Sequence, residues 1–109
     1  MKKYLFICGK NQLRSPTAEN IFSNIEGLEV RSAGINEDAE YKVTIEDMDW
    51  ADIIFVMEKK QKEKLVKKFN RFLKGKKVAV LDIPDEYGYM DEKLITLLKD
   101  KMKKWIDLI

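Results

Sequence analysis

The feature that most restricts the fold is a regular alternation between short apolar runs and longer segments with helical periodicity. Segments of strand length occupy residues 3–8, 28–34, 52–57 and 76–83, and the first and third of them are mainly apolar. Segments with helical patterns occupy residues 15–27, 44–51, 59–75 and 90–109. Strands that are apolar along their whole length and alternate with helices are typical of a parallel sheet covered on both faces. We therefore expect an α/β fold: a doubly wound, four-stranded, mostly parallel sheet with helices on both faces.

Two of the expected helices have detailed signals. Ser15 is expected at the N-cap of the first helix, with Pro16 at its first helical position and Gly27 at its end. Thr44 is expected to cap the second. The segment 59–75 is expected to be one amphipathic helix, whose inward side chains are Leu65, Val66, Phe69, Phe72 and Leu73.

Composition limits the domain organisation and the chemistry. With 109 residues, 45% of them hydrophobic and 37% charged, the chain is expected to form a single domain, residues 1–109. The single cysteine cannot form an internal disulfide, and no export signal pattern is present, so we expect a reducing, cytoplasmic setting. No apolar run approaches the roughly 20 residues of a membrane span. The absence of histidine excludes Cys-His and Ser-His catalytic pairs and the usual zinc sites.

The only cysteine, Cys8, ends the first apolar run, and Arg14 follows six positions later, just ahead of the first expected helix. The main-chain N–H groups of the five residues between them can surround a tetrahedral oxyanion, and Arg14 can donate two parallel hydrogen bonds to it. These five residues are Gly9, Lys10, Asn11, Gln12 and Leu13. The same donors would stabilise a thiolate at Cys8. The pattern therefore predicts a nucleophilic cysteine facing a phosphate or sulfate at the carboxyl end of the first strand; a small buried core cysteine is the alternative.

Three carboxylates could serve as a general acid near this loop. Asp82 follows an apolar strand and could instead accept hydrogen bonds from its own loop, and Asp91 precedes a helix that it could cap. Asp85 lies in a proline-containing loop, a setting suited to catalytic groups, and we favour it. Tyr87 could flank the substrate cleft and stack on an aryl group, or be a partly buried core residue.

The segment "CGKNQLRSPTAE" resembles the phosphate-binding loop of the low-molecular-weight protein tyrosine phosphatases. The stretches "RSAG", "VTIEDMDWADIIFVMEKKQKEKL" and "DIPDEY" resemble later segments of that family in the same order. The resemblance implies a role for each matching residue: Cys8 as nucleophile, Asn11 as holder of the loop backbone, Arg14 as phosphate clamp, Ser15 as hydrogen-bond partner of the thiolate and Asp85 as general acid.

The chain departs from the family pattern in three ways. Lys10 stands where the family usually has glycine before the asparagine, and Leu13 stands where many members have a second cysteine. Without that cysteine no protective disulfide can form in the loop. The stretch between "SAG" and "VTIEDM" also lacks the aromatic insertion that helps to form the family's substrate cleft.

These observations predict a metal-independent, cofactor-free phosphatase that acts on a phosphorylated protein or small molecule. Two alternatives remain: an arsenate reductase that uses an external thiol, and a catalytically weak phosphate-binding or interaction module. Residues 57–77 hold ten Lys or Arg and two Glu, which could bind RNA or another polyanion. We favour a solvated helix face there, because no nucleic-acid motif accompanies the charge.

Overall fold

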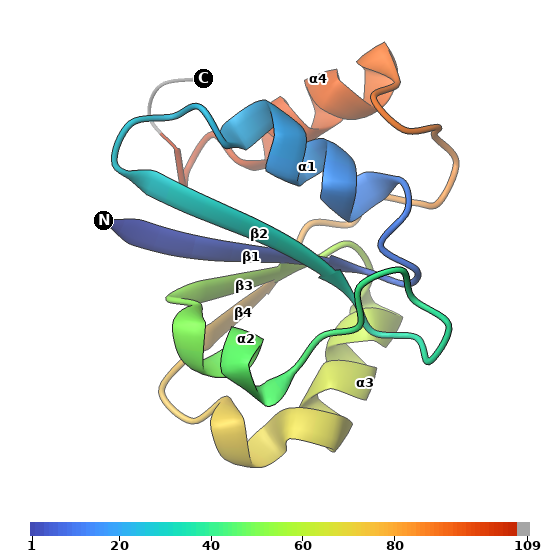
Figure 1. The fold of residues 1–109 in the computed structure, drawn as a ribbon. Helices are drawn as coiled ribbons and strands as arrows, with labels where there is room; N and C mark the ends of the chain where they lie inside the picture. The colour runs from blue at the N-terminus through green and yellow to red at the C-terminus, as the bar shows by residue number, and fades with distance from the viewer. Residues whose placement is uncertain (107–109) are drawn as a thin grey trace.

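The computed structural model describes residues 1–106 as a four-stranded sheet with helices on both faces (Figure 1). Its strands are β1 (Lys2–Cys8), β2 (Leu28–Gly34), β3 (Ile53–Val56) and β4 (Lys77–Val80). Its helices are α1 (Arg14–Phe22), α2 (Ile45–Trp50), α3 (Lys59–Phe69) and α4 (Glu92–Lys101), with the short 3₁₀ helix η1 (Asn70–Phe72) after α3. The strand order is β2-β1-β3-β4 and every neighbouring pair is parallel. The predicted doubly wound α/β fold is confirmed.

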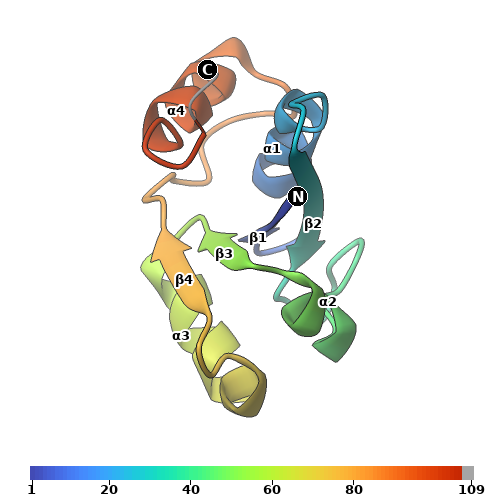
Figure 2. The same ribbon diagram turned by 90° about the vertical axis from the view of Figure 1, so that its left-hand side faces the viewer.

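Strand β1 lies inside the sheet and divides the core in two. Alternate side chains of a strand point to opposite faces, so Tyr4, Phe6 and Cys8 pack in one apolar cluster while Leu5 and Ile7 pack in the other. The first cluster lies under α1 and α4, and the second lies against α2 and α3. These two pairs of helices cover opposite faces of the sheet (Figures 1 and 2). No helix among residues 1–106 is long and apolar enough to cross a membrane.

The arrangement of the connections places a crevice at the carboxyl end of β1. The chain leaves β1 towards α1 on one face of the sheet, and leaves β3 towards α3 on the other (Figure 2). Adjacent parallel strands whose connections diverge in this way open a crevice beyond their carboxyl ends. The loop that begins at Cys8 therefore faces the first residues of α3.

The first helix starts differently from the prediction. The helix α1 begins at Arg14, and its N-cap position is Leu13, which has no side-chain cap. Ser15 lies inside the first turn and is fully buried, so it is not the N-cap. Its hydroxyl instead lies 3.0 Å from Cys8 Sγ. At α2 the prediction is confirmed: Thr44 caps the helix in a reciprocal capping box with Asp47.

The third helix is shorter than expected. The helix α3 ends at Phe69, and η1 then turns the chain towards β4. Of the five side chains expected to face inward, Leu65, Phe69 and Leu73 are buried, whereas Val66 and Phe72 are each 39% exposed. Val66 follows Leu65 directly and is therefore rotated by about 100° around the helix axis, away from the core.

The last helix is also shorter than the expected segment 90–109. The helix α4 spans Glu92–Lys101, and Asp91 caps it by accepting a hydrogen bond from the Lys93 main-chain N–H at 2.8 Å. The expected final turn at residues 107–109 lies outside the described residues.

Candidate active site

The loop after β1 is folded around the sulfur of Cys8. Asn11 has a φ of 57°, in the left-handed region that asparagine tolerates better than most residues, and this turns its main-chain N–H towards Cys8 Sγ at 3.2 Å. Its side-chain amide donates to Ser15 Oγ at 2.9 Å and to Ser32 Oγ at 3.0 Å, which ties the loop to α1 and to β2. Asn11 thus fixes the loop through its main-chain N–H and through its side-chain amide.

Two polar groups lie within hydrogen-bond distance of Cys8 Sγ. The Asn11 main-chain N–H donates to it, and the Ser15 hydroxyl can also donate to it. Because the Asn11 amide already donates to Ser15 Oγ, the hydroxyl hydrogen is available to the sulfur or to the Ala33 carbonyl, which is farther away at 3.4 Å. A thiolate at Cys8, the nucleophilic form of a cysteine, could accept both of these hydrogen bonds.

Arg14 is 5% exposed and is anchored on one side. Its Nη1 donates to Glu58 Oε1 at 2.6 Å and to the Ile83 carbonyl at 2.8 Å, and its Nε lies 3.7 Å from Asp85 Oδ1. A buried guanidinium needs such partners to offset its desolvation. Since Nη1 serves two acceptors, the Nε–Nη2 edge is the one that can bind two oxygens of an anion.

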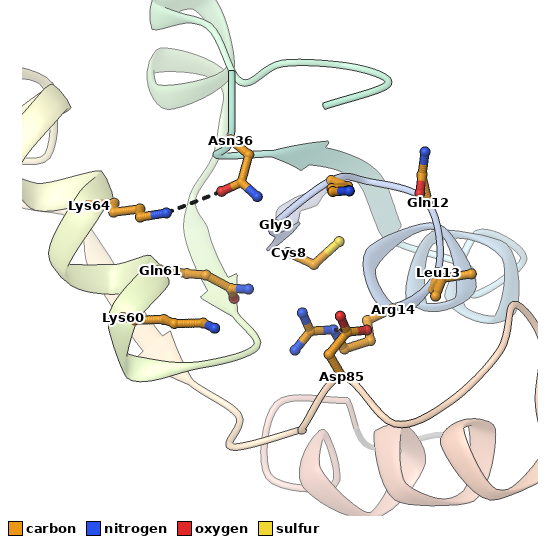
Figure 3. Close-up of a pocket in the computed structure, with 11 residues that line it drawn as sticks. Cys8, Gly9, Gln12, Leu13, Arg14, Asn36, Lys60, Gln61, Lys64 and Asp85 are labelled. Atoms are coloured by element: carbon orange, nitrogen blue, oxygen red, sulfur yellow. Dashed lines mark hydrogen bonds and ion pairs between the residues drawn. The ribbon is translucent and has the colours of Figure 1, made fainter. Parts of the chain in front are cut away.

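A cavity of about 170 Å³ opens in front of Cys8 and Arg14 (Figure 3). Residues 8–14, here named the phosphate loop, form one side of the cavity. Helix α3 forms the opposite side, and the loop after β4 forms the edge. Its lining residues are Cys8, Gly9, Lys10, Gln12, Leu13, Arg14, Asn36, Lys60, Gln61, Lys64 and Asp85. Within residues 1–106, no group of His, Cys, Asp and Glu side chains could hold a metal ion.

The structure separates the three candidate carboxylates. Asp85 lines the cavity, with its side chain 65% exposed. Asp82 is exposed, has a φ of 56° and lines a different groove beside the start of α3. Asp91 is the α4 cap. Only Asp85 of the three therefore lies where it could reach a phosphate ester bound at Cys8.

The remaining predicted site residues are arranged in two layers. Asn11 and Ser15 lie behind the loop and support it. Gln12 and Lys10 line the cavity and also contact Glu40 at 3.3 Å and Asp38 at 3.6 Å, respectively. The structure does not bring Tyr87 to the cavity. Its half-buried side chain packs against the core cluster under α4 and lines a separate surface groove.

The carboxyl end of β2 supports the loop through a close backbone approach. A Cβ atom at Gly34 would lie 2.7 Å from the Gly9 carbonyl oxygen, 3.0 Å from the Asn11 main-chain nitrogen and 2.5 Å from the Ala39 side chain. Only glycine fits there without displacing the loop.

Several site residues were missed by sequence reasoning, and all lie beyond the loop. Glu58 anchors Arg14, and Gln61 accepts hydrogen bonds from the Met57 and Glu58 main-chain N–H groups at 3.0 Å each. Their spacing, Glu-x-x-Gln directly after an apolar run, is a readable capping-box signal. Asn36, Lys60 and Lys64 carry no local signal of a site; the fold alone brings them to the cavity.

Comparisons with known proteins agree with this geometry. The model of the family described as low molecular weight phosphotyrosine protein phosphatase matches residues 3–44, which include the whole phosphate loop. No curated protein sequence matches the chain significantly.

Solved structures of this type share the fold over nearly the whole chain. The YwlE arginine phosphatase from Geobacillus stearothermophilus is 24% identical, with a TM-score of 0.75 over 95% of this chain and 92% of that one. The tyrosine phosphatase Wzb from Escherichia coli K30, in complex with phosphate, is 22% identical, with a TM-score of 0.76 over 95% of each chain. SP-PTP, a low molecular weight protein tyrosine phosphatase from Streptococcus pyogenes, is 17% identical, with a TM-score of 0.78 over 97% of this chain and 94% of that one. In the sequence of residues 3–44 and in its fold, the chain is similar to the low molecular weight phosphotyrosine protein phosphatases, and this similarity indicates a phosphatase.

Proposed function

We propose that this protein is a cysteine-dependent phosphomonoester hydrolase, formed by residues 1–109 as one domain, and that it acts through a cysteinyl-phosphate intermediate. The observation that carries the proposal is the convergence of four groups on one small cavity. Cys8 Sγ, in contact with the Asn11 N–H and the Ser15 hydroxyl, lies at the base, and Arg14, the loop residues 9–13 and Asp85 lie around the space in front of it.

In the first step, the Cys8 thiolate attacks phosphorus in line with the leaving oxygen. The P–S bond forms as the P–O ester bond breaks, while the loop N–H groups and Arg14 hold the three equatorial oxygens and stabilise their charge. Asp85, in its protonated form, gives its proton to the departing oxygen, so that the product leaves as a neutral alcohol.

In the second step, water attacks the phosphorus of the cysteinyl-phosphate. The Asp85 carboxylate takes a proton from this water, the P–S bond breaks, and inorganic phosphate and the Cys8 thiolate are released. The positive charges of this chain suffice for both steps, and the proposed cycle uses no cofactor. A reducing cytoplasm, the proposed setting, keeps the single thiol in its active form.

The test is the Cys8→Ser variant. We expect phosphate release from 4-nitrophenyl phosphate to fall by about 10⁴-fold or more, because a serine hydroxyl has no neighbouring base to activate it. Binding of inorganic phosphate, measured by calorimetry, should persist because the loop and Arg14 remain. Acid-quenched wild-type enzyme should show a phosphate adduct on Cys8 by mass spectrometry. Undiminished turnover in the variant would refute cysteine catalysis, and thiol-dependent arsenate reduction by the wild type, without phosphate release, would replace it with the reductase alternative.

A further inference from the structure

One wall of the cavity is formed by two lysines of α3. Lys60 and Lys64 lie one helical turn apart, on one face of the helix, and both line the cavity (Figure 3). The Lys64 ammonium group donates to the neutral amide oxygen of Asn36 at 3.3 Å. The wall opposite Cys8 therefore presents two ammonium groups beside the place of the phosphate.

The side chains that line the cavity carry more positive charge than is required to bind a single phosphate group. Four lining side chains are cationic, Lys10, Arg14, Lys60 and Lys64, and one, Asp85, is a carboxylate. Arg14 and the loop N–H groups already form the expected phosphate site. Among the described residues that line the cavity, none is aromatic, so this wall offers positive charge where an aryl phosphate would need a ring.

The positions of the two lysines on α3 are electrostatically unfavourable for the helix itself. Lys60 lies in the first turn of α3, near the positive end of the helix dipole, where the carboxylate of the N-cap residue Glu58 is the acidic group and the turn itself contains none. Like charges four residues apart, as at Lys60 and Lys64, also repel each other. The nearest carboxylate, Glu58, lies 3.8 Å from the Lys60 ammonium through one oxygen, and its other oxygen is engaged by Arg14.

An anion bound between the two lysines would offset all of these costs. It would separate the like charges, and it would be attracted by the same helix N-terminus. Because the site adjoins the phosphate position, the anion would belong to the substrate that carries the phosphate.

We propose that Lys60 and Lys64 bind a second anionic group of the substrate, so that the enzyme prefers phosphomonoesters bearing another phosphate or carboxylate close to the ester. This inference rests on the proposed hydrolase function. It makes the two lysines specificity-determining residues, and it selects doubly anionic substrates over plain aryl phosphates.

The first test compares kcat/KM for two matched substrate pairs. One pair is fructose 1,6-bisphosphate and fructose 6-phosphate; the other is a phosphotyrosyl peptide with flanking Asp residues and the same peptide with Asn. We expect the more anionic member of at least one pair to have a kcat/KM about 10-fold higher at low ionic strength, and the pair that shows the preference identifies the source of the second anion. The preference should shrink in high salt.

Two double variants distinguish a specific effect of Lys60 and Lys64 from the effect of the overall positive charge of α3. In the Lys60→Gln/Lys64→Gln variant the ratio within the preferred pair should fall to near one. The control, Lys62→Gln/Lys67→Gln, removes the same charge from the same helix at positions that do not line the cavity, and it should keep the wild-type ratio. Circular dichroism confirms that both variants are folded.

A binding measurement keeps this inference separate from the hydrolase proposal. Pyrophosphate and inorganic phosphate are titrated into the Cys8→Ser protein with and without the two lysines. We expect pyrophosphate to bind about 10-fold more tightly, and this advantage to disappear with Lys60 and Lys64. Absence of hydrolysis with a lysine-dependent pyrophosphate preference would refute the hydrolase and support the anion site. Ratios near one in every comparison, or a preference that survives in the double lysine variant, would overturn the anion site.

Discussion

The two loops that meet at the cavity differ in how firmly the fold holds them. In the phosphate loop, Cys8, Asn11 and Arg14 are buried. Hydrogen bonds tie Cys8 to α1, Asn11 to α1 and β2, and Arg14 to Glu58 and to the Ile83 carbonyl. In the segment 82–91, most side chains are exposed, and Asp85 is positioned by one ion pair of 3.7 Å to Arg14. The loop expected to bind the anion is thus held by the core, whereas the proposed acid lies on an exposed segment that meets the site at Arg14, through Asp85 and the Ile83 carbonyl. Substitutions in the two loops should therefore have different kinds of effect.

After Cys8→Ser, the largest effect is expected in the segment 82–91, where Asp85→Asn removes the proposed acid. Hydrolysis of alkyl phosphates, whose leaving oxygen needs a proton, should slow by about 100-fold or more. The formation of the cysteinyl-phosphate from 4-nitrophenyl phosphate should slow much less, because nitrophenolate leaves without help. Rapid-quench burst kinetics must separate the two steps, since the same carboxylate activates water in the second.

The control for this prediction is Asp82→Asn, three residues earlier and outside the cavity. It should change both substrates to a similar, small extent. If the dependence on the leaving group followed Asp82 and left Asp85 without effect, the assignment of the acid would be wrong, although the hydrolase proposal would stand.

A smaller effect is expected on the firmly held side, from Gly34→Ala. The added methyl group would meet the Gly9 carbonyl oxygen at 2.7 Å and would have to displace the phosphate loop. Overpacking of this kind costs about 1–3 kcal/mol of unfolding free energy, and the displaced loop should bind inorganic phosphate about 10-fold more weakly. Urea denaturation and calorimetry measure the two quantities.

The matched substitution in the other loop is Gly88→Ala. A Cβ at Gly88 meets no atom within 4 Å, so the change should leave stability within about 0.5 kcal/mol of wild type. If the Gly34 and Gly88 variants lost the same amount of unfolding free energy, the two loops would not differ in how firmly the fold holds them.

The same difference explains what the sequence could predict. The phosphate loop was predictable because its signals are local: an apolar strand ends at Cys8, and Arg14 stands six residues later at the start of a helix. The parallel sheet was predictable for the same reason, since each strand and helix carries its own periodicity. The boundary errors, such as the N-cap expected at Ser15, arose where a tertiary contact with Cys8 used the side chain that the local pattern had assigned to the helix end.

The opposite wall could not be predicted, because it depends on contacts between distant segments. Glu58 is 44 residues from Arg14 in the chain, and Lys64 meets Asn36 across 28 residues. From the local sequence alone, Glu58 is explained as a helix cap and Lys64 as a solvated lysine. The choice among Asp82, Asp85 and Asp91 was likewise a matter of position in space, since all three follow the same strand within eleven residues.

The smallest effect is expected at Glu58, which holds Arg14, the residue at which the two loops meet. Its carboxylate lies 2.6 Å from Arg14 Nη1, so it both holds the guanidinium and offsets part of the charge that attracts phosphate. The Glu58→Gln variant keeps an oxygen acceptor for Nη1 but removes the negative charge. Inorganic phosphate should then bind about 3-fold more tightly, as expected for one nearby charge in a partly solvated site.

The comparison variant is Glu58→Ala, which removes both the charge and the acceptor. It leaves Arg14 with the Ile83 carbonyl as its remaining Nη1 partner, so the guanidinium loses its fixed orientation and phosphate binding should weaken. If calorimetry shows tighter phosphate binding for Glu58→Gln and weaker binding for Glu58→Ala, the effect of the Glu58 charge is distinguished from its effect on the orientation of Arg14. Weaker binding in both would mean that the negative charge of Glu58 is itself needed to hold Arg14 in place, and the firm anchoring of the phosphate loop would then extend across the cavity to the start of α3.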